Sequence, residues 1–214
     1  GGGLRPNRFI LENFYEQGNS AKKAVYFLEP FVFFSIGPND AHKFIYSEPL
    51  RFQFLKKLIL DHYPLRSILT YIRSKFTYDW FFQRPEALLR NSYTLEGIPV
   101  DPAKVKARME SLYTDGFKEE NFLRYAEEFE RIAMETESHG ATLHVVLSPT
   151  LIGPEPGTDR MLAWLEELKK RHPFTLHVFT NAILDPKYYY DLDHLNTAGV
   201  EYFMRDFLKP ALNP

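Results

Sequence analysis

Helices and strands alternate along the second half of the chain, and this alternation constrains the fold more than any other feature of the sequence. Two short apolar runs, residues 142–147 and 174–179, have the length and composition of buried strands. Helical patterns precede, separate and follow them at residues 119–138, 159–171 and 197–208. Because neighbouring parallel strands are joined by crossover helices, this order predicts an α/β fold with a parallel sheet covered by helices on both faces.

The first half of the chain adds a strand and several helices to this plan. Residues 23–35 are rich in Val and Phe and predict a buried strand that runs into the turn Gly37-Pro38-Asn39-Asp40. Helices are expected at residues 5–17, 49–62, 64–75 and 104–112. A chain of 214 residues can bury one sizeable core, so residues 1–214 are interpreted as a single domain, with residues 48–100 as an aromatic-rich helical insertion.

Composition and charge exclude several kinds of function. A formal net charge of -2 gives no overall electrostatic reason to expect a nucleic-acid partner. No apolar run approaches the roughly 20 residues that a membrane-spanning helix needs. The absence of cysteine excludes disulfides, thiolate metal sites and a cysteine nucleophile. The opening Gly1-Gly2-Gly3 is compatible with a mature or excised segment of a longer protein.

Residues 190–199 carry the clearest chemical signal, a carboxylate that precedes an imidazole in a polar turn before the last helix. The turn is short enough to fold the Asp191 carboxylate back onto the ring of His194. That contact would fix one tautomer and support the imidazolium that forms when histidine accepts a proton, as in a Ser-His-Asp system. The alternative is an ordinary helix start, in which Asp193 or Asn196 caps the helix and His194 is a surface residue.

No serine of the chain is an obvious nucleophile for this pair. Ser20 follows a helical segment and is interpreted as a loop residue, whereas Ser35 lies inside a predicted strand. Ser148 precedes Pro149 and is interpreted as part of a turn at the end of a strand. The pair therefore indicates either a nucleophile in a segment upstream of Gly1 or an active site that has lost its nucleophile.

The carboxyl ends of the predicted strands are the expected place for a ligand site. In open α/β sheets, ligands bind in the crevice beyond these strand ends. Asn39, Ser148 and the turn around His194 all follow predicted strands. We therefore expect the three to share one rim of the sheet.

The string from Asp191 to Asn196, followed by a small residue, a glycine and a helix, resembles the last block of the SGNH (GDSL-type) hydrolases. The resemblance implies a flavodoxin-like three-layer sandwich with a mostly parallel sheet, in which His194 is the general base and Asp191 its orienting partner. It also makes Asn39 a candidate oxyanion donor, because a Gly-x-Asn-Asp block follows a buried strand in this family. The alternative for Asn39 is ordinary turn chemistry. The family's first block, which carries the serine, has no counterpart in this chain.

Within that superfamily, the layout is similar to the DltD-like and alginate-acetylation-type proteins of bacterial envelopes. The similarity rests on the helical insertion, on the strand ending in Ser148-Pro149 and on Tyr188-Tyr189-Tyr190 before the Asp-x-x-His turn. It implies an extracytoplasmic esterase or acyltransferase that needs no cofactor and acts on an acylated envelope glycan or a lipid-linked substrate. Under this alignment Asn39 falls in an insertion. The alternative function is a catalytically inactive glycan-binding or assembly subunit.

Residues 48–90 combine basic and aromatic side chains. The cations are Arg51, Lys56, Lys57, Arg66, Arg73, Lys75, Arg84 and Arg90. A basic surface with aromatic rings is suited to a membrane surface, an anionic glycan or an envelope-protein partner. The alternative is that most of the rings belong to the core and that the charges lie on solvated helix faces.

A metal site is a further interpretation of the same turn. Asp191, Asp193 and His194 offer oxygen and nitrogen ligands for a divalent cation. The other histidines are scattered, and His144 and His177 fall inside predicted strands, where they are interpreted as core residues. No second group of ligands follows from the sequence, and the resemblance implies no metal.

Overall fold

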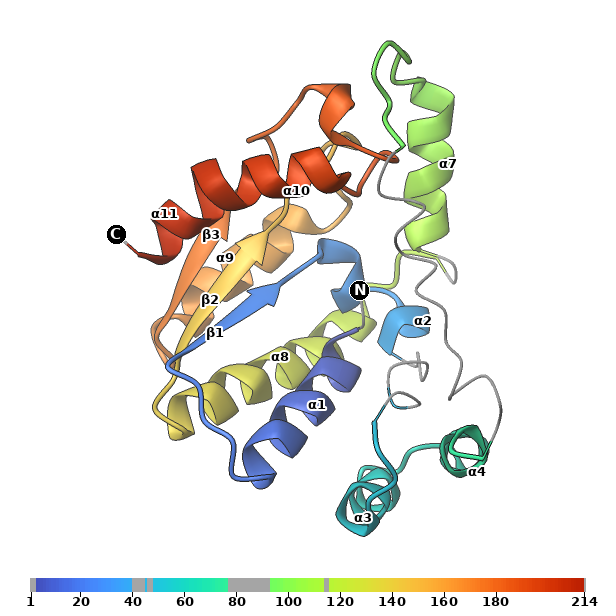
Figure 1. The fold of residues 1–214 in the computed structure, drawn as a ribbon, viewed down its shortest axis with the longest axis vertical. Coiled ribbons are helices and arrows are strands. Elements are labelled where there is room, and N and C mark those ends of the chain that lie inside the picture. Colours follow the sequence, from blue (N-terminus) through green and yellow to red (C-terminus); the bar gives the residue numbers. More distant parts are fainter. Residues whose placement is uncertain (1–2, 40–44, 46–47, 77–92, 114–115, 214) are drawn as a thin grey trace.

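The structure is a computed structural model that describes residues 3–39, 45, 48–76, 93–113 and 116–213. In this part of the chain, three parallel strands form one sheet in the order β1-β2-β3. They are β1 (Lys23–Phe27), β2 (Thr142–Leu147) and β3 (Phe174–Val178), shown in Figure 1. Val25 pairs with His144, and Val145 pairs with Leu176. The predicted α/β fold with a parallel sheet is therefore confirmed.

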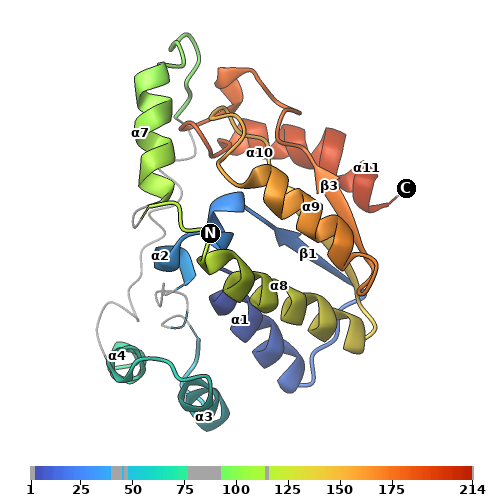
Figure 2. The ribbon, with the colours of Figure 1, turned by 180° about the vertical axis from the view of Figure 1, so that it is seen from behind.

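Helices lie on both faces of this sheet, as Figures 1 and 2 show. One face carries α1 (Leu4–Glu16), α8 (Asn121–Ser138) and α9 (Thr158–Leu168). The other face carries α10 (Thr197–Phe203), which continues through a π-helical turn at Met204–Leu208 into α11 (Lys209–Leu212). None of the described helices is both long enough and apolar enough to cross a bilayer.

The side chains of β2 alternate between two hydrophobic clusters, because successive residues of a strand point to opposite faces. Leu143, Val145 and Leu147 belong to the larger cluster, together with residues of α1, α8 and α9. Val146 points the other way and packs in a second cluster with Phe203 of α10. Because β2 is buried on both faces, it is the fixed centre of the sheet. The segment that begins with Ser148, directly after β2, therefore has a defined position.

The strand predicted at residues 23–35 is wrong beyond Phe27, where β1 ends. Pro30 has no N–H with which to continue a sheet ladder, and the chain leaves the sheet there. It forms a 3₁₀ turn at Pro30–Phe33 and then the short helix α2 (Ile36–Asn39). The aromatic residues of this stretch are buried by packing between helices, as the 5.4 Å separation of the Phe33 and Phe122 rings shows.

Two helices of the expected insertion are present as α3 (Phe52–Leu60) and α4 (Leu65–Ser74), and α7 (Pro102–Leu112) follows them. α3 and α4 share a small hydrophobic cluster of their own, which includes Phe9 of α1. The ring of Phe9 lies 5.0 Å from that of Phe54 and 5.3 Å from that of Tyr63. Residues 77–92, with Tyr78, Trp80, Phe81, Phe82, Arg84 and Arg90 of the expected basic aromatic segment, lie outside the described residues.

Arg8 of α1 connects this small cluster to the rest of the molecule. The residue is only 5% exposed, and its guanidinium forms ion pairs with Glu12 at 2.6 Å, Asp61 at 2.8 Å and Glu128 at 2.5 Å. A buried charge needs such partners, because an unpaired one is strongly disfavoured inside a protein. Arg8 therefore links the end of α3 to α1 and α8.

Candidate functional site

The turn that carries Asp191 and His194 is held at both ends by hydrogen bonds. Tyr189 and Leu195 form an antiparallel bridge, and Tyr190 donates its N–H to His194 O at 3.1 Å. Asn196 then starts α10, because its Oδ1 accepts the N–H of Gly199 at 2.9 Å. The helix cap considered in the alternative interpretation is therefore present at Asn196, and it fixes where the turn ends.

Two further contacts of this turn explain its composition. Nδ2 of Asn196 donates to Lys187 O at 2.8 Å, which ties the start of α10 to the chain before the turn. At Gly199, a Cβ atom would lie 2.0 Å from Tyr188 O, so only glycine fits. The local sequence therefore specifies a rigid turn, and rigidity is what a positioned acid–base pair needs.

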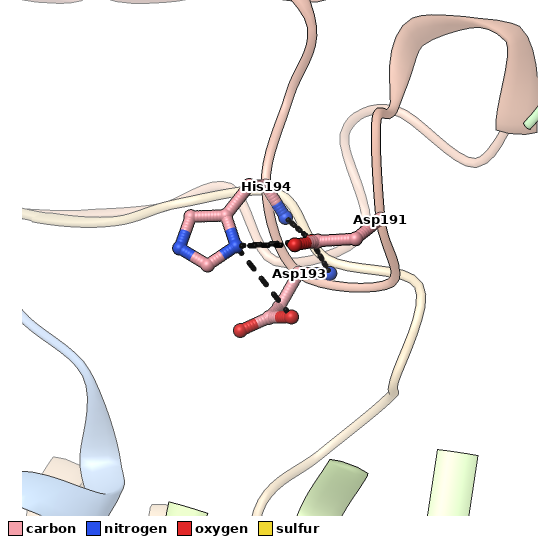
Figure 3. A group of neighbouring side chains, drawn as sticks. All are labelled: Asp191, Asp193 and His194. Carbon is pink, nitrogen blue, oxygen red and sulfur yellow. Dashed lines mark hydrogen bonds and ion pairs between the residues drawn. The ribbon is translucent and has the colours of Figure 1, made fainter. Parts of the chain in front are cut away.

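Asp191 and His194 make the contact that their spacing predicts, as Figure 3 shows. Nδ1 of His194 lies 3.0 Å from Oδ1 and 3.1 Å from Oδ2 of Asp191. Oδ1 also accepts the backbone N–H of His194 at 2.8 Å and that of Asp193 at 3.1 Å. Because the carboxylate engages Nδ1, Nε2 is the ring nitrogen that is left to exchange a proton with another molecule.

The electrostatics of the pair follow from these contacts. The hydrogen bond to Asp191 raises the pKa of His194 above its ordinary value, although partial burial opposes this, and Asp193 adds to the rise. Burial alone would raise the pKa of Asp191, but the hydrogen bonds from His194 and from the N–H of Asp193 outweigh it and hold this pKa well below its ordinary value. Asp191 is therefore a carboxylate at neutral pH, ready to support a protonated ring.

Arg108 of α7 neutralises the second carboxylate of the turn. Its Nε lies 2.8 Å from Oδ1 of Asp193, and its Nη2 lies 2.6 Å from Oδ2, which is a bidentate ion pair. Asp193 Oδ1 is 3.7 Å from Nδ1 of His194, farther than either oxygen of Asp191. No signal in the sequence points to Arg108, because this residue lies on a helix that is far from the turn along the chain.

The expected metal ligands lie close together. Ligand atoms of Asp191, Asp193 and His194 all lie within 4.8 Å of one another. However, the guanidinium of Arg108 already binds both oxygens of Asp193, so a cation would have to displace it. Asp191 is likewise occupied by the ring and by two backbone N–H groups. This donor set fits an ion pair beside a histidine base better than it fits a metal centre.

A pocket of about 140 Å³ opens at the carboxyl ends of the strands, beside this turn. It is lined by Glu29 after β1, Ser148 after β2 and Asp193, together with Phe31 and Glu155. Burial, with the nearby charge of Glu29, raises the pKa of Glu155 to about 7. Its Oε2 accepts the N–H of Phe31 at 3.1 Å. The expected shared rim thus holds Ser148 and the turn, and it adds two carboxyl groups that the sequence did not single out.

Asn39 does not join this rim. Its Nδ2 donates to Val32 O at 2.7 Å and to Ser35 O at 3.0 Å, and its Oδ1 accepts the N–H of Arg5 at 3.3 Å. The residue is 1% exposed, and it is absent from the lining of the pocket. Both amide hydrogens are used inside the fold, so the geometry offers none for an oxyanion and gives Asn39 a structural part in α2.

Ser20 and Ser148 lie where the sequence suggested, whereas Ser35 is not in a strand, because β1 ends at Phe27. Ser20 lies in an exposed loop before the amino end of β1, the opposite end from His194. Ser35 is fully buried and donates to Leu112 O at 3.3 Å. Ser148 lines the pocket, but no side chain in the described residues hydrogen-bonds to Nε2 of His194. In the described part of the chain, the imidazole of His194 is thus held by the Asp191 carboxylate, and no serine is paired with its Nε2.

His144 and His177 are neighbours on adjacent strands of the sheet. Nδ1 of His144 lies 3.1 Å from Nε2 of His177, and the rings are stacked. Burial lowers the pKa of both residues below the ordinary value for histidine. Both lie on the α10 side of the sheet, away from the turn, but only His144 is buried as expected for a core histidine, whereas His177 is partly exposed.

No protein-family model matches the chain, and no curated protein or solved structure is significantly similar to it.

Proposed function

We propose that this chain is the catalytic-base portion of an SGNH-type esterase or acyltransferase with a three-layer α/β sandwich. The observation that carries the proposal is the contact of both Asp191 oxygens with Nδ1 of His194, which leaves Nε2 as the proton acceptor. The turn that carries the pair reaches, through Asp193, a pocket at the carboxyl ends of the strands, where α/β folds bind their ligands.

The proposed reaction is acyl transfer through a serine. Nε2 of His194 accepts the proton of the serine hydroxyl while the serine oxygen attacks the carbonyl carbon of the ester. Asp191 supports the imidazolium that forms, and the same proton then passes to the leaving alcohol oxygen. His194 then deprotonates a water or an acceptor hydroxyl, whose oxygen attacks the acyl carbon. The acyl–serine bond breaks, and the proton on Nε2 passes to the serine oxygen. The raised pKa of His194 favours the protonated intermediate state.

We further propose that the serine is carried by a strand that precedes α1 and pairs with the free edge of β1. Leu28 donates its N–H to Val146 O, and Lys22 accepts the N–H of Thr142. Because backbone groups alternate in direction, those of Val25 and Phe27 point away from β2, toward the open edge. A groove of about 550 Å³, lined by Ile10, Phe14 and Ile132 among others, runs along this edge.

The handedness of the connections supports this position for the strand. The long connection from β1 to β2 ends in α8, and α9 joins β2 to β3. Both helices cover one face of the sheet, and α1 lies on the same face. Strand–helix–strand connections are almost always right-handed. Successive strands whose connecting helices lie on the same face are therefore added to the sheet in one direction. A strand before α1 would therefore lie on the side of β1 opposite β2, and its carboxyl end would reach the rim that holds His194.

The substrate that we propose is an acylated cell-envelope glycan or a lipid-linked acyl donor, and the location is extracytoplasmic. Both rest on the resemblance of the Asp-x-x-His turn and the helical insertion to envelope SGNH proteins. The pocket beside the turn is compatible with a polar substrate, because Glu29, Glu155 and Ser148 supply hydrogen-bonding groups among apolar walls. No nucleic-acid partner is proposed.

The second candidate is a non-catalytic module of the same fold that binds glycans or assembles with a partner. It is favoured by one observation, that Nε2 of His194 has no hydroxyl partner among the described residues. An active site that has lost its nucleophile would keep the structural contacts of Asp191 without needing a serine.

A fluorophosphonate probe applied to the protein extended at its amino end distinguishes the two candidates. We expect labelling of one serine in the extended protein and none in residues 1–214. His194→Ala should abolish the labelling, whereas His139→Ala, which changes a histidine of α8's C-terminal end, should retain it. Failure to label any extended form would support the binding module, and equal labelling of the His194→Ala variant would overturn the catalytic assignment.

A further inference from the structure

Six large apolar side chains on and beside α3 and α4 are more than half exposed. They are Phe52 (80%), Ile59 (56%), Leu60 (65%), Leu65 (70%), Leu69 (56%) and Phe76 (75%). Single exposed apolar residues are common on soluble proteins, but a group of this kind on two neighbouring helices marks an interaction site. We call these six residues, with the cations between them, the α3–α4 surface.

The α3–α4 surface faces away from the body of the protein. The buried sides of the two helices, including Phe54, Leu58 and Tyr71, meet in the cluster that contains Phe9. The exposed residues occupy the opposite sides: Phe52 and Ile59 are seven residues apart on α3, and Leu65 and Leu69 are four apart on α4. Both helices lie at one end of the molecule in Figures 1 and 2, remote from α10.

The charges on this surface are almost all positive. Lys56, Arg66 and Arg73 are exposed, and the described residues give none of them an ion pair. Asp61 is the one acidic residue between positions 49 and 76, and it is bound to Arg8. The exposed apolar side chains are therefore interspersed with cations that have no acidic partner on these helices.

We propose that the α3–α4 surface docks on an anionic lipid surface. Its apolar side chains project outward from the helices, as is needed to enter the boundary between headgroups and acyl chains. The cations lie where lipid phosphates would neutralise them, and each is worth a several-fold gain in binding near such a surface. A protein partner would need equally placed acidic and apolar groups, whereas an anionic bilayer supplies both without a specific shape. This inference does not depend on the proposed reaction.

Co-sedimentation of residues 1–214 with vesicles tests the inference. We expect binding to vesicles of equal parts phosphatidylglycerol and phosphatidylcholine to be at least about tenfold tighter than to phosphatidylcholine alone. The double variant Leu65→Ser/Leu69→Ser should weaken binding about tenfold or more, because two leucines no longer enter the interface. Arg66→Gln and Arg73→Gln should each weaken it about fivefold and reduce its dependence on salt.

The matched control is Leu123→Ser/Leu184→Ser, which changes two leucines that are each 65% exposed elsewhere on the molecule. This control should bind vesicles as the unchanged protein does, and circular dichroism should show that both double variants are folded. Equal binding to the two vesicle types, no binding to either, or unchanged binding by the α3–α4 double variant would each overturn the inference. Sedimentation equilibrium without lipid tests whether the surface is instead a dimer interface. A dimer that is dissociated by Leu65→Ser/Leu69→Ser would also overturn the inference.

Discussion

Nη2 of Arg108 lies 2.6 Å from Oδ2 of Asp193, although the two residues are 85 positions apart in the sequence. This ion pair holds α7 against the turn that carries His194. The guanidinium binds both oxygens of Asp193 and so offsets part of the charge that this carboxylate exerts on the imidazole, although Asp193 still contributes to the raised pKa of His194. The hydrogen bond to Asp191 therefore remains the strongest influence on the pKa of His194.

Replacing Arg108 should therefore change the titration of His194. In Arg108→Gln, the Asp193 carboxylate loses its partner and exerts more of its charge on the ring, so the pKa of His194 should rise further. Stability should fall by about 1 kcal/mol, because the pair is partly exposed. Proton NMR titration of the imidazole measures the first effect. Arg124→Gln on α8 is the control, and a lower pKa in Arg108→Gln would contradict the explanation.

Replacing Asp191 should have the opposite effect on the same ring. The hydrogen bond from His194 to Asp191 is the largest cause of the raised pKa, and an asparagine cannot stabilise an imidazolium as a carboxylate does. We expect the pKa of His194 to fall in Asp191→Asn, and we expect kcat of the extended enzyme to drop by about 10⁴. Asp185→Asn, at an exposed carboxylate, serves as the control. A His194 pKa that does not move would refute the assignment of Asp191 as its partner.

The same pair predicts how stability depends on pH. His194 has a raised pKa in the fold, so its contribution is complete below its ordinary pKa and is lost as pH rises through the raised value. Asp191 has a lowered pKa, so its contribution is present above its ordinary pKa and is lost as pH falls through the lowered value. The two overlap between roughly pH 4 and 6.5. His194→Gln should destabilise the protein most in that window, as thermal unfolding across pH will show. An effect that grows above this window would contradict the linkage.

Glu155 should reduce stability at neutral and alkaline pH. Its pKa is raised from 4.5 to about 7, so the folded state becomes less stable as pH rises through this interval and levels off above it. Glu155→Gln removes the buried charge while its side-chain oxygen can still accept the N–H of Phe31. We expect the variant to gain between about 1 and 3 kcal/mol at pH 8 and little below pH 4.5. Denaturant unfolding at the two pH values measures this, with the exposed Glu166→Gln as the control.

Gly199→Ala should destabilise the turn that holds the pair. The new Cβ would lie 2.0 Å from Tyr188 O, a backbone atom that cannot rotate away. A loss of about 3 kcal/mol or more is expected, because the start of α10 must shift. The exposed neighbour Val200→Ala should change stability by well under 1 kcal/mol. Chemical denaturation compares the two, and equal stabilities would show that the chain relaxes more easily at this point than its contacts indicate.

Local features of the sequence predicted the sheet and the acid–base pair. β2 and β3 were recognisable because each is a short apolar run between helical patterns, and the Asp191–His194 contact follows from a spacing within one turn. The strand over residues 23–35 was overestimated, because its phenylalanines are buried by helix packing, which has the same apolar composition as a strand. Pro30 was the signal that marked the true end.

Features that depend on distant parts of the chain were not predictable. Arg108 reaches Asp193 from another helix, and Glu155 acquires its raised pKa only when the fold brings Glu29 close and removes water. The sequence around Asn39 matches an oxyanion block, yet its side-chain amide donates to backbone oxygens of the segment just before its own short helix. Spacing identifies groups that meet within a turn, whereas tertiary contacts decide which other groups join them.

Because α3 and α4 are attached through Phe9 and Arg8, we expect this pair of helices to unfold separately from the sheet. The small cluster of these helices contains no residue of the sheet, so they can open without separating β1, β2 and β3. Such an opening would leave Arg8 without Asp61 while its pairs with Glu12 and Glu128 persist. We therefore expect α3 and α4 to open before the sheet does, while β1, β2 and β3 keep the Asp191–His194 pair in place.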